Sequence, residues 1–269
     1  SDWLIDLTGL PVVAMSPAAG AHGELCGLMC IRAAHEHNGE NKRKVVLVPE
    51  SAHGTNPASA SLCGYSVESI PCNSRGRVDL QALNKRLSDD VAAVMITNPN
   101  TCGLFETEAL KIADAVHNAG AYFYMDGANF NAIVGRLTLK QLGVDAMHIN
   151  LHKTFSTPHG GGGPGAGPTV LSDALAPFAP VPFLIKKNKK LFMVEHAGLE
   201  DSKFSIGRMK GFHGQFGVFI RALSYIMSLG GDGLSQVSGD AVLNANYLRV
   251  KLSKYITPFH DGVCMHEVL

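Results

Sequence analysis

Short polar clusters follow four apolar runs of this sequence and hold most of the residue types that could do chemistry. The carboxyl ends of parallel strands meet at one edge of an open α/β sheet, where ligands bind, so four such clusters predict one site. A turn explains a single cluster more easily than it explains four. The clusters are residues 49–57 (PESAHGTNP), 97–101 (TNPNT), 126–129 (DGAN) and 150–154 (NLHKT).

Asp126 and Lys153 have the most specific chemistry within these clusters. An aspartate at the end of a buried strand stays charged only if a cation faces it, and a protonated pyridine nitrogen is such a cation. A lysine after a strand, among glycine, serine, threonine and histidine, is suited to a Schiff base. The alternatives are that Asp126 caps a helix and that Lys153 lies on the surface.

Two further segments fit the same ligand. Residues 20–24 (GAHGE) precede the first predicted helix, and small residues there let backbone N–H groups approach a phosphate at its positive end. Glycine-rich helix starts are common, so this signal alone is weak. His53, flanked by small residues, could lie flat over a pyridine ring or could bond to the backbone.

Two patterns are similar to sites for other ligands, but the residues involved argue against both. His22, Cys26 and Cys30 are four apart on one predicted helix, as metal ligands can be, yet burial explains small thiols there and we predict no metal. Residues 163–169 (GPGAGPT) are similar to a phosphate loop, but Pro168 stands where its lysine should be. We expect residues 160–167 to form a wall of the site's mouth, with His159 as its one polar side chain and close to substrate.

The strands and helices that position these clusters can be predicted from the pattern of hydrophobic residues. Four apolar runs predict buried parallel strands, and helical patterns between them predict right-handed crossovers in an α/β fold. A glycine- and proline-rich segment, residues 157–168, excludes regular structure. Residues 186–190 are basic and predict a loop, and helical patterns return at 211–229 and continue to about residue 255. The predicted strands are 45–48, 91–96, 121–125 and 146–149, and the clearest helices are 24–37 and 106–119.

Composition excludes several classes of partner. The chain has 269 residues, 17% of them charged, with a formal net charge of zero. Without a basic excess we expect no nucleic acid and no acidic membrane surface as partner. No apolar run approaches the roughly 20 residues that span a bilayer. Six cysteines without a CxxC pair indicate reduced thiols in a cytosolic protein.

The longest motifs resemble those of the glycine decarboxylase family of fold-type I enzymes, which use pyridoxal phosphate (PLP). The segment 19–25 (AGAHGEL) is most similar to subunit 2 of the two-subunit bacterial form. The motifs are 51–61 (SAHGTNPASAS), 97–101, 103–106 (GLFE), 126–129, 150–165 (NLHKTFSTPHGGGGPG) and 205–208 (SIGR).

This resemblance implies a fold-type I PLP-dependent transferase with a mostly parallel sheet flanked by helices. Lys153 would carry PLP as a Schiff base, Asp126 would pair with the pyridine nitrogen and His53 would stack on the ring. The resemblance further implies cofactor contacts by Gly20, Ala21 and His152 near the phosphate, by Thr97 or Asn98 near the ring hydroxyl, and by Ala128.

The same resemblance implies decarboxylation of glycine and transfer of the aminomethyl group to the lipoyl arm of H-protein. It also implies a heterotetramer with subunit 1. We expect residues 1–256 to form the PLP-binding large domain and residues 257–269 to begin a truncated small C-terminal domain. Two alternatives stay open: another fold-type I enzyme, such as an amino-acid decarboxylase or desulfurase, and a non-catalytic partner similar to subunit 1.

Overall fold

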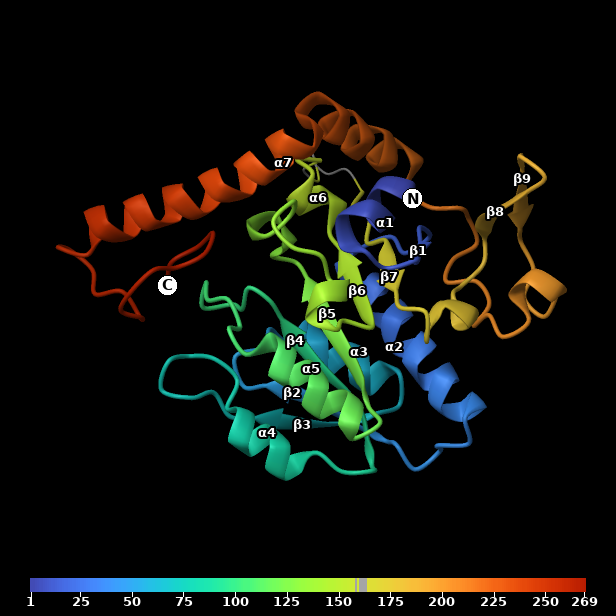
Figure 1. The fold of residues 1–269 in the computed structure, drawn as a ribbon, viewed down its shortest axis with the longest axis horizontal. Coiled ribbons are helices and arrows are strands. Elements are labelled where there is room, and N and C mark those ends of the chain that lie inside the picture. The colour runs from blue at the N-terminus through green and yellow to red at the C-terminus, as the bar shows by residue number, and fades with distance from the viewer. Residues whose placement is uncertain (158, 160–163) are drawn as a thin grey trace.

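A seven-stranded sheet runs through the middle of the molecule (Figure 1). The computed structural model describes residues 1–157, 159 and 164–269. The strand order is β1-β7-β6-β5-β4-β2-β3, with β7 antiparallel to β1 and β6 and the other pairs parallel. The strands are β1 (Val12–Ala14), β2 (Val45–Pro49), β3 (Ser66–Ile70), β4 (Val91–Thr97), β5 (Tyr122–Gly127), β6 (Ala146–Ile149) and β7 (Thr169–Leu171). All four strands predicted from the sequence are confirmed.

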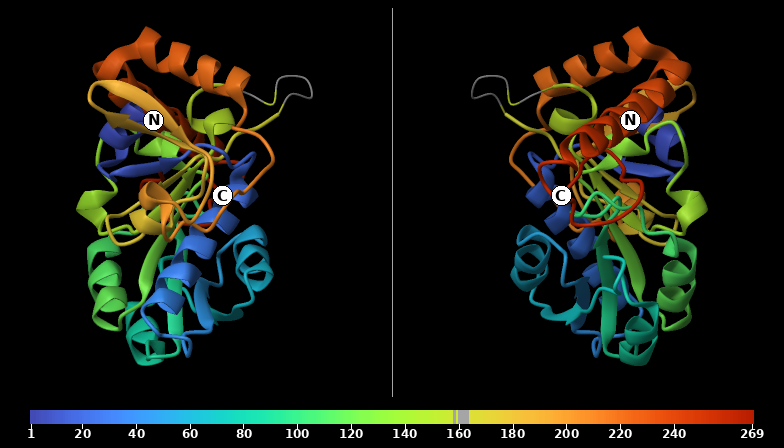
Figure 2. Two further views of the ribbon diagram at one scale, coloured as in Figure 1. Left: turned by 90° about the vertical axis from the view of Figure 1, so that its right-hand side faces the viewer. Right: turned by 90° about the vertical axis from the view of Figure 1, so that its left-hand side faces the viewer.

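Helices cover both faces of the sheet, as the edge-on views show (Figure 2). One face packs against α2 (Gly20–His37) and α3 (Thr55–Leu62), and the other against α4 (Leu80–Arg86) and α5 (Ala109–Asn118). Each face therefore has its own hydrophobic core, which the continuous apolar runs of the central strands require. The short helical elements are α1 (Asp2–Thr8), α6 (Leu151–Thr154), and the 3₁₀ turns η1 (Phe130–Ala132), η2 (Lys140–Leu142), η3 (Ala176–Phe178) and η4 (Glu200–Ser202).

Glycines on α2 leave room for the neighbouring chain at the edge of the sheet. A Cβ on Gly20 would lie 2.6 Å from Nδ2 of Asn150, and one on Gly23 would lie 2.6 Å from the carbonyl oxygen of Gly167. The Gly167 carbonyl is backbone, so a side chain at position 23 would push the helix away, whereas at position 20 the Asn150 side chain would have to shift. These glycines bring the first turn of α2 to the edge where the strands end.

The helix predicted at residues 24–37, which is α2, begins earlier than the sequence indicated. Residues 20–24, predicted to precede the helix, form the first turn of α2. The N–H of Ala18 donates to Nδ1 of His22 (3.1 Å), and the N–H of Gly23 donates to the carbonyl of Ala19 (2.9 Å), so the turn closes before Glu24. The proposed phosphate cradle is therefore the helix terminus itself.

The basic segment 186–190 is part of a hairpin, so its prediction as a loop was wrong. Strands β8 (Phe183–Lys187) and β9 (Lys190–Val194) pair antiparallel around Asn188 and Lys189. Both turn residues have positive φ, 52° and 64°, which a tight two-residue hairpin turn requires. The alternation that marks a half-buried strand is missing because both faces of this hairpin are largely exposed.

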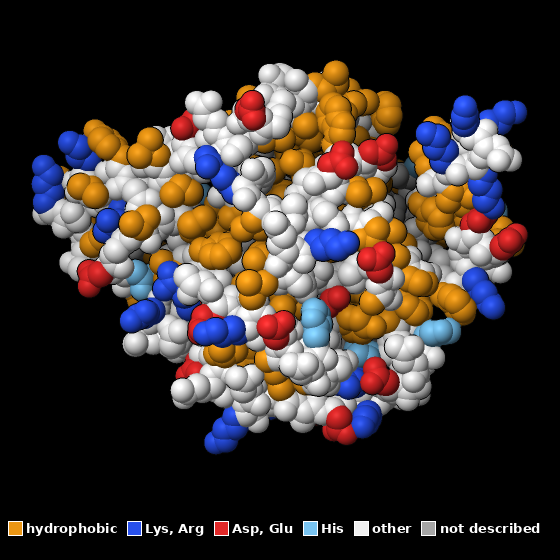
Figure 3. All heavy atoms as spheres, viewed as in Figure 1, with side chains coloured by type: hydrophobic (Ala, Val, Ile, Leu, Met, Phe, Trp, Pro, Cys, Tyr) orange, Lys and Arg blue, Asp and Glu red, His pale blue; other side chains and the backbone are white. Residues whose placement is uncertain are grey.

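Helix α7 (Phe216–Leu252) crosses the carboxyl edge of the sheet and bends at Gly230, where φ is 65° and ψ is −176°. Hydrophobic side chains gather over its first half on one face of the molecule (Figure 3). Residues 253–269 then return toward the sheet, where the N–H of Met265 donates to the carbonyl of Gly103 (2.7 Å). No helix in the described part of the chain combines the length and hydropathy needed to cross a bilayer.

Candidate active site

The register of the sheet brings three polar side chains into one row. Thr97 of β4 pairs with Asp126 of β5, and Asp126 pairs with His148 of β6. Laterally paired residues of parallel strands point to the same face, which here is the face covered by α2 and α3. The clusters that follow β2, β4, β5 and β6 therefore meet at one edge, as the sequence predicted.

Asp126 is the centre of this edge and is fully buried. Its Oδ2 accepts from Nε2 of His53 (2.6 Å) and from Nδ2 of Asn56 (2.7 Å), and its Oδ1 accepts from the backbone N–H of Ala128 (2.8 Å). Nε2 of His148 lies 3.4 Å from Oδ1. Burial by itself would raise the pKa of Asp126, but His148, His53 and Asn56 outweigh it and hold that pKa well below its usual range. The aspartate is thus kept as an anion inside the protein.

Glu24 lies beside Asp126, and its pKa is shifted in the opposite direction. Only 2% of Glu24 is exposed, and its Oε2 accepts from Nδ2 of Asn56 (3.1 Å) and from the hydroxyl of Ser59 (3.1 Å). Burial raises the pKa of Glu24 above its ordinary value, and the negative charge of Asp126 adds to the rise. Two neighbouring carboxyl groups therefore have pKa values pushed apart, a pattern found at functional sites. We call Glu24, Asn56, Asp126 and His148 the aspartate cluster.

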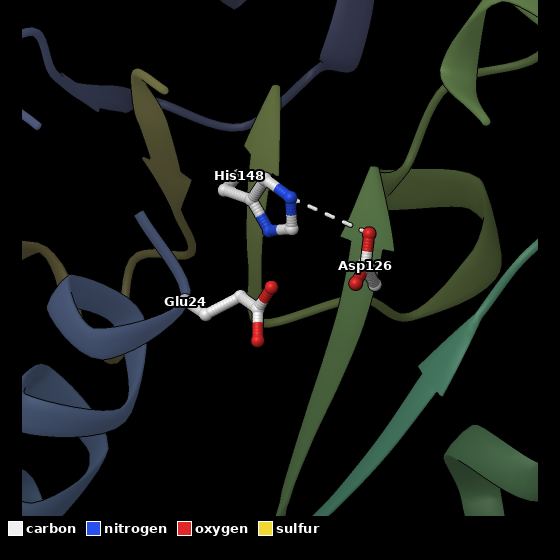
Figure 4. Close-up of side chains that lie close together, drawn as sticks. All are labelled: Glu24, Asp126 and His148. Carbon is white, nitrogen blue, oxygen red and sulfur yellow. Dashed lines mark ion pairs between the residues drawn. The ribbon is translucent and has the colours of Figure 1, made fainter. Parts of the chain in front are cut away.

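The aspartate cluster includes the one group of possible metal ligands found among the described residues. Ligand atoms of Glu24, Asp126 and His148 all lie within 4.8 Å of one another, and all three residues are buried (Figure 4). Asn56 and Ala128 already donate to these carboxyl oxygens, and the hydroxyl of Tyr124 lies 2.8 Å from Nδ1 of His148. A hydrogen-bond network accounts for this arrangement without an ion.

His53 is half-exposed and joins the aspartate cluster from the loop after β2. Its Nδ1 accepts from the N–H of Thr55 (3.3 Å), so its hydrogen is on Nε2 and points at Asp126. This hydrogen bond raises the pKa of His53 above its ordinary value, against the opposing effect of burial. The predicted ring-stacking role of His53 stays a prediction, but its place beside Asp126 agrees with such a role.

Lys153 lies in α6, the single turn after β6, and its side chain is exposed. Asn150 begins this turn, and its carbonyl accepts from the N–H groups of Lys153 and Thr154 (3.0 Å each). The hydroxyl of Thr157 caps the carbonyl of Leu151 (2.8 Å). Backbone and capping contacts thus fix the position of Lys153 while its amine stays accessible. We call residues 150–157 the lysine segment.

His152 connects the lysine segment to the glycine-rich stretch. Its Nδ1 accepts from the N–H of Ala166 (3.2 Å), and burial, with a smaller effect of His159, lowers its pKa to about 4. The rings of His152 and His159 lie 4.1 Å apart, and a Cβ on Gly165 would lie 2.9 Å from both. Residues 160–163 of the predicted wall lie outside the described residues.

The remaining predicted contacts surround the same edge. Gly20 and Ala21 are in the first turn of α2, where free N–H groups and the helix dipole favour an anion. Thr97 is buried, with its hydroxyl 3.5 Å from Oδ1 of Asn56. Oδ1 of Asn98 accepts from the N–H of Glu106 (3.0 Å), whereas its buried Nδ2 has no hydrogen-bond partner among the residues described. That orphaned donor suits a ring oxygen.

Sequence reasoning missed Glu24, Asn56 and His148. Asn56 was inside a quoted cluster, but nothing local distinguished it from a loop residue. Glu24 and His148 meet Asp126 only through helix packing and sheet register, which a single sequence does not specify. Sequence reasoning also missed Glu267, whose Oε1 lies 3.4 Å from Nδ2 of Asn129 at the same edge.

Comparison with known proteins identifies the family. The model described as aminotransferase class-V matches residues 24–165, just over half of the chain and all four strand-end clusters. The chain belongs to the aminotransferase class-V family. This family assignment and the mostly parallel sheet confirm the predicted fold-type I class, a class of PLP-dependent enzymes.

The relatives with high sequence identity share one name. The chain is 62% identical to a probable glycine dehydrogenase (decarboxylating) subunit 2 of Caulobacter vibrioides, over 99% of this chain and 51% of the relative. It is 51% identical to the protein of that name from Caldanaerobacter subterraneus, over 98% of this chain and 53% of the relative. The resemblance to glycine decarboxylases is confirmed, and the chain spans about half the length of these relatives.

Solved structures agree with the class-V fold. An inhibitor-bound glycine decarboxylase (P-protein) of the glycine cleavage system has a TM-score of 0.74 at 22% identity, covering 94% of this chain and 57% of that one. Oryza sativa TDC with PLP has a TM-score of 0.70 at 15% identity, covering 99% of this chain and 58% of that one. At these identities the likeness concerns the fold.

Proposed function

We propose that this chain is the cofactor-carrying part of a glycine decarboxylase subunit 2, with PLP bound covalently to Lys153. The observation that supports this most is the buried, ionised Asp126, which has four nitrogen neighbours at the sheet edge and the accessible Lys153 one strand further on. A buried carboxylate in a ligand-binding edge calls for a cationic partner, and a protonated pyridine nitrogen supplies it.

Different residues of the sheet edge would bind different parts of the cofactor. Asp126, oriented by the N–H of Ala128, would pair with the pyridine nitrogen in place of Nε2 of His53, and the His53 ring would then cover the cofactor ring. The first turn of α2, at Gly20 and Ala21, would hold the phosphate together with His152. Thr97 or Asn98 would bond the ring hydroxyl, for which the unpartnered Nδ2 of Asn98 is suited.

The proposed reaction is decarboxylation of glycine, followed by transfer of the aminomethyl group to the lipoyl arm of H-protein. When bound, PLP supplies the electron sink for the electron pair left as carbon dioxide departs. The protein's part is to keep Asp126 negative, so that the ring nitrogen stays protonated while charge develops. We also propose subunit 1 as the partner of this chain, in a heterotetramer.

Covalent attachment tests the cofactor assignment. Borohydride reduction of the PLP-loaded protein, followed by peptide mapping, should place the label on Lys153. Lys153→Ala should abolish fixation, whereas Lys85→Ala, an exposed lysine on α4, should leave it unchanged. Label on any other lysine of the wild-type chain would refute the assignment.

Product analysis tests the reaction. Carbon dioxide release from labelled glycine should require lipoylated H-protein and subunit 1, and it should exceed release from larger amino acids. Efficient release from a larger amino acid without H-protein would indicate a different fold-type I decarboxylase.

A further inference from the structure

Tyr124 and His148 form a buried chain of contacts that ends on Asp126. Tyr124 precedes Asp126 by two residues on β5, so the two side chains share a face of the sheet, and His148 is paired with Asp126 on β6. The hydroxyl of Tyr124 lies 2.8 Å from Nδ1 of His148, whose Nε2 lies 3.4 Å from Oδ1 of Asp126. No more than 1% of any of these residues is exposed. The histidine thus bridges a phenol and a carboxylate away from water.

Two glycines of α2 leave the space that these two rings occupy. A Cβ on Gly23 would lie 2.6 Å from Cβ of His148, and one on Gly27 would lie 2.5 Å from Cε2 of Tyr124. Residues four apart lie on the same face of a helix, so the glycines form one slot. The rings are stacked in it, with centroids 6.2 Å apart and planes 28° apart. The slot confines His148 between the helix and the sheet and fixes which nitrogen faces which neighbour.

The neighbours of His148 determine where its hydrogen lies. Burial raises the pKa of Tyr124 well above its ordinary value, so the phenol keeps its hydrogen and can donate it to Nδ1. The hydrogen of a neutral His148 is then on Nε2, where it faces the carboxylate. In the other tautomer a bare Nε2 would face Oδ1 of Asp126, and two buried acceptors without a hydrogen between them destabilise each other. Tyr124 therefore selects the tautomer whose Nε2–H faces Asp126, with Nε2 3.4 Å from Oδ1.

We propose that Tyr124 is a positioning residue, which fixes the tautomer of His148 so that its Nε2–H faces Oδ1 of Asp126 and keeps this carboxylate oriented for the nitrogen of a bound ring. The cofactor part of this inference rests on the proposed function. The hydroxyl of Tyr124 has His148 and no other residue as its hydrogen-bond partner in the described chain, so its effect on Asp126 passes through the histidine. His53 and Asn56 hold Oδ2, which leaves the Oδ1 side to Ala128 and His148.

The tautomer can be observed directly in protein labelled with ¹⁵N-histidine. The wild-type protein should show a hydrogen on Nε2 of His148, with the signals assigned by their loss in His148→Gln. Tyr124→Phe removes only the hydroxyl and should mix the two tautomers. Tyr122→Phe, on the same face of the same strand, is the matched control and should leave the His148 signals unchanged.

The consequence for the cofactor is measured as PLP affinity of the same proteins. Loss of one buried hydrogen bond corresponds to a weakening of about threefold to tenfold in Tyr124→Phe. His148→Gln, which keeps a donor near the Nε2 position, should bind PLP more tightly than His148→Leu, and this pair tests the relay even if Tyr124→Phe does not fold. An unchanged tautomer in Tyr124→Phe, or a changed tautomer with unchanged PLP affinity, would overturn the proposal. If the wild-type protein binds no PLP, the proposed function fails, while the ¹⁵N spectrum still tests the link between Tyr124 and His148.

Discussion

The aspartate cluster and the lysine segment lie at the same sheet edge but are built in opposite ways. The aspartate cluster takes one buried side chain from each of α2, α3, β5 and β6. Asn56 donates to Glu24 and Asp126, and Nε2 of His148 lies 3.4 Å from Oδ1 of Asp126. The lysine segment is one turn of helix held by backbone contacts, with Lys153 exposed. One side is preorganised within this chain, and the other presents an accessible amine. Under the proposed function, the cluster would set the electrostatics of the site and the lysine segment would make the covalent attachment.

The largest expected effect separates catalysis from attachment. Asp126→Asn should leave PLP bound to Lys153 but slow decarboxylation by at least about 100-fold, or about 2.7 kcal/mol of barrier, because a neutral amide cannot stabilise a protonated ring nitrogen. Turnover of glycine and borohydride fixation are the two measurements. Asp114→Asn, an exposed aspartate on α5, should change neither. Near-normal turnover of Asp126→Asn would show that the aspartate cluster does not set the electrostatics of the reaction.

The packing beneath the aspartate cluster can be tested through stability. Gly23→Ala should lower the free energy of unfolding by roughly 1–3 kcal/mol, because the added Cβ meets the Gly167 carbonyl and His148 at 2.6 Å. Gly217→Ala, a helical glycine of α7 with nothing within 4 Å, should be neutral or slightly stabilising. Urea unfolding of both variants gives the comparison. Equal midpoints would mean that the slot in α2 is not tight.

The pH dependence of stability tests the charge state of Glu24. Because burial raises its folded-state pKa above the ordinary 4.5, the stability it contributes is complete below that value and is lost as pH rises through the folded pKa. Glu24→Gln cannot ionise, so unfolding midpoints measured upward from pH 4.5 should fall less steeply than in the wild type. Glu108→Gln, at the less buried start of α5, should run parallel to the wild type. If the midpoints of Glu24→Gln and the wild type fell equally with pH, Glu24 would not ionise in the pH range measured.

The smallest effect is expected at the exposed side of the site. Glu267 is half-exposed, and its contact with Asn129 is long at 3.4 Å. Glu267→Gln should therefore change the free energy of unfolding by less than about 0.5 kcal/mol. A larger loss in urea unfolding would show that residues near the lysine segment are as tightly coupled as the aspartate cluster.

The elements and the contact network were not equally predictable from the sequence. Strands such as 91–96 were evident because both faces of a central parallel strand are buried, which makes the run continuously apolar. Asp126 and Lys153 stood out through their chemistry. The partners of Asp126 could not be found because lateral register sets the pairing of Asp126 with His148, and the packing of α2 brings in Glu24. The division proposed at residues 256 and 257 stays a prediction.

The three glycines of α2 also bear on how the protein folds. Glycine inside a helix costs roughly 0.5–1 kcal/mol relative to alanine, so a helix with Gly23 and Gly27 facing the sheet is a weak helix in isolation. Its formation should depend on docking against β5 and β6, whose rings fill the space beside these glycines. Amide protons of α2 are then expected to exchange with solvent together with those of the central strands, in one cooperative unit. The close contact that aims this helix at the active site would thus make its folding inseparable from that of the sheet.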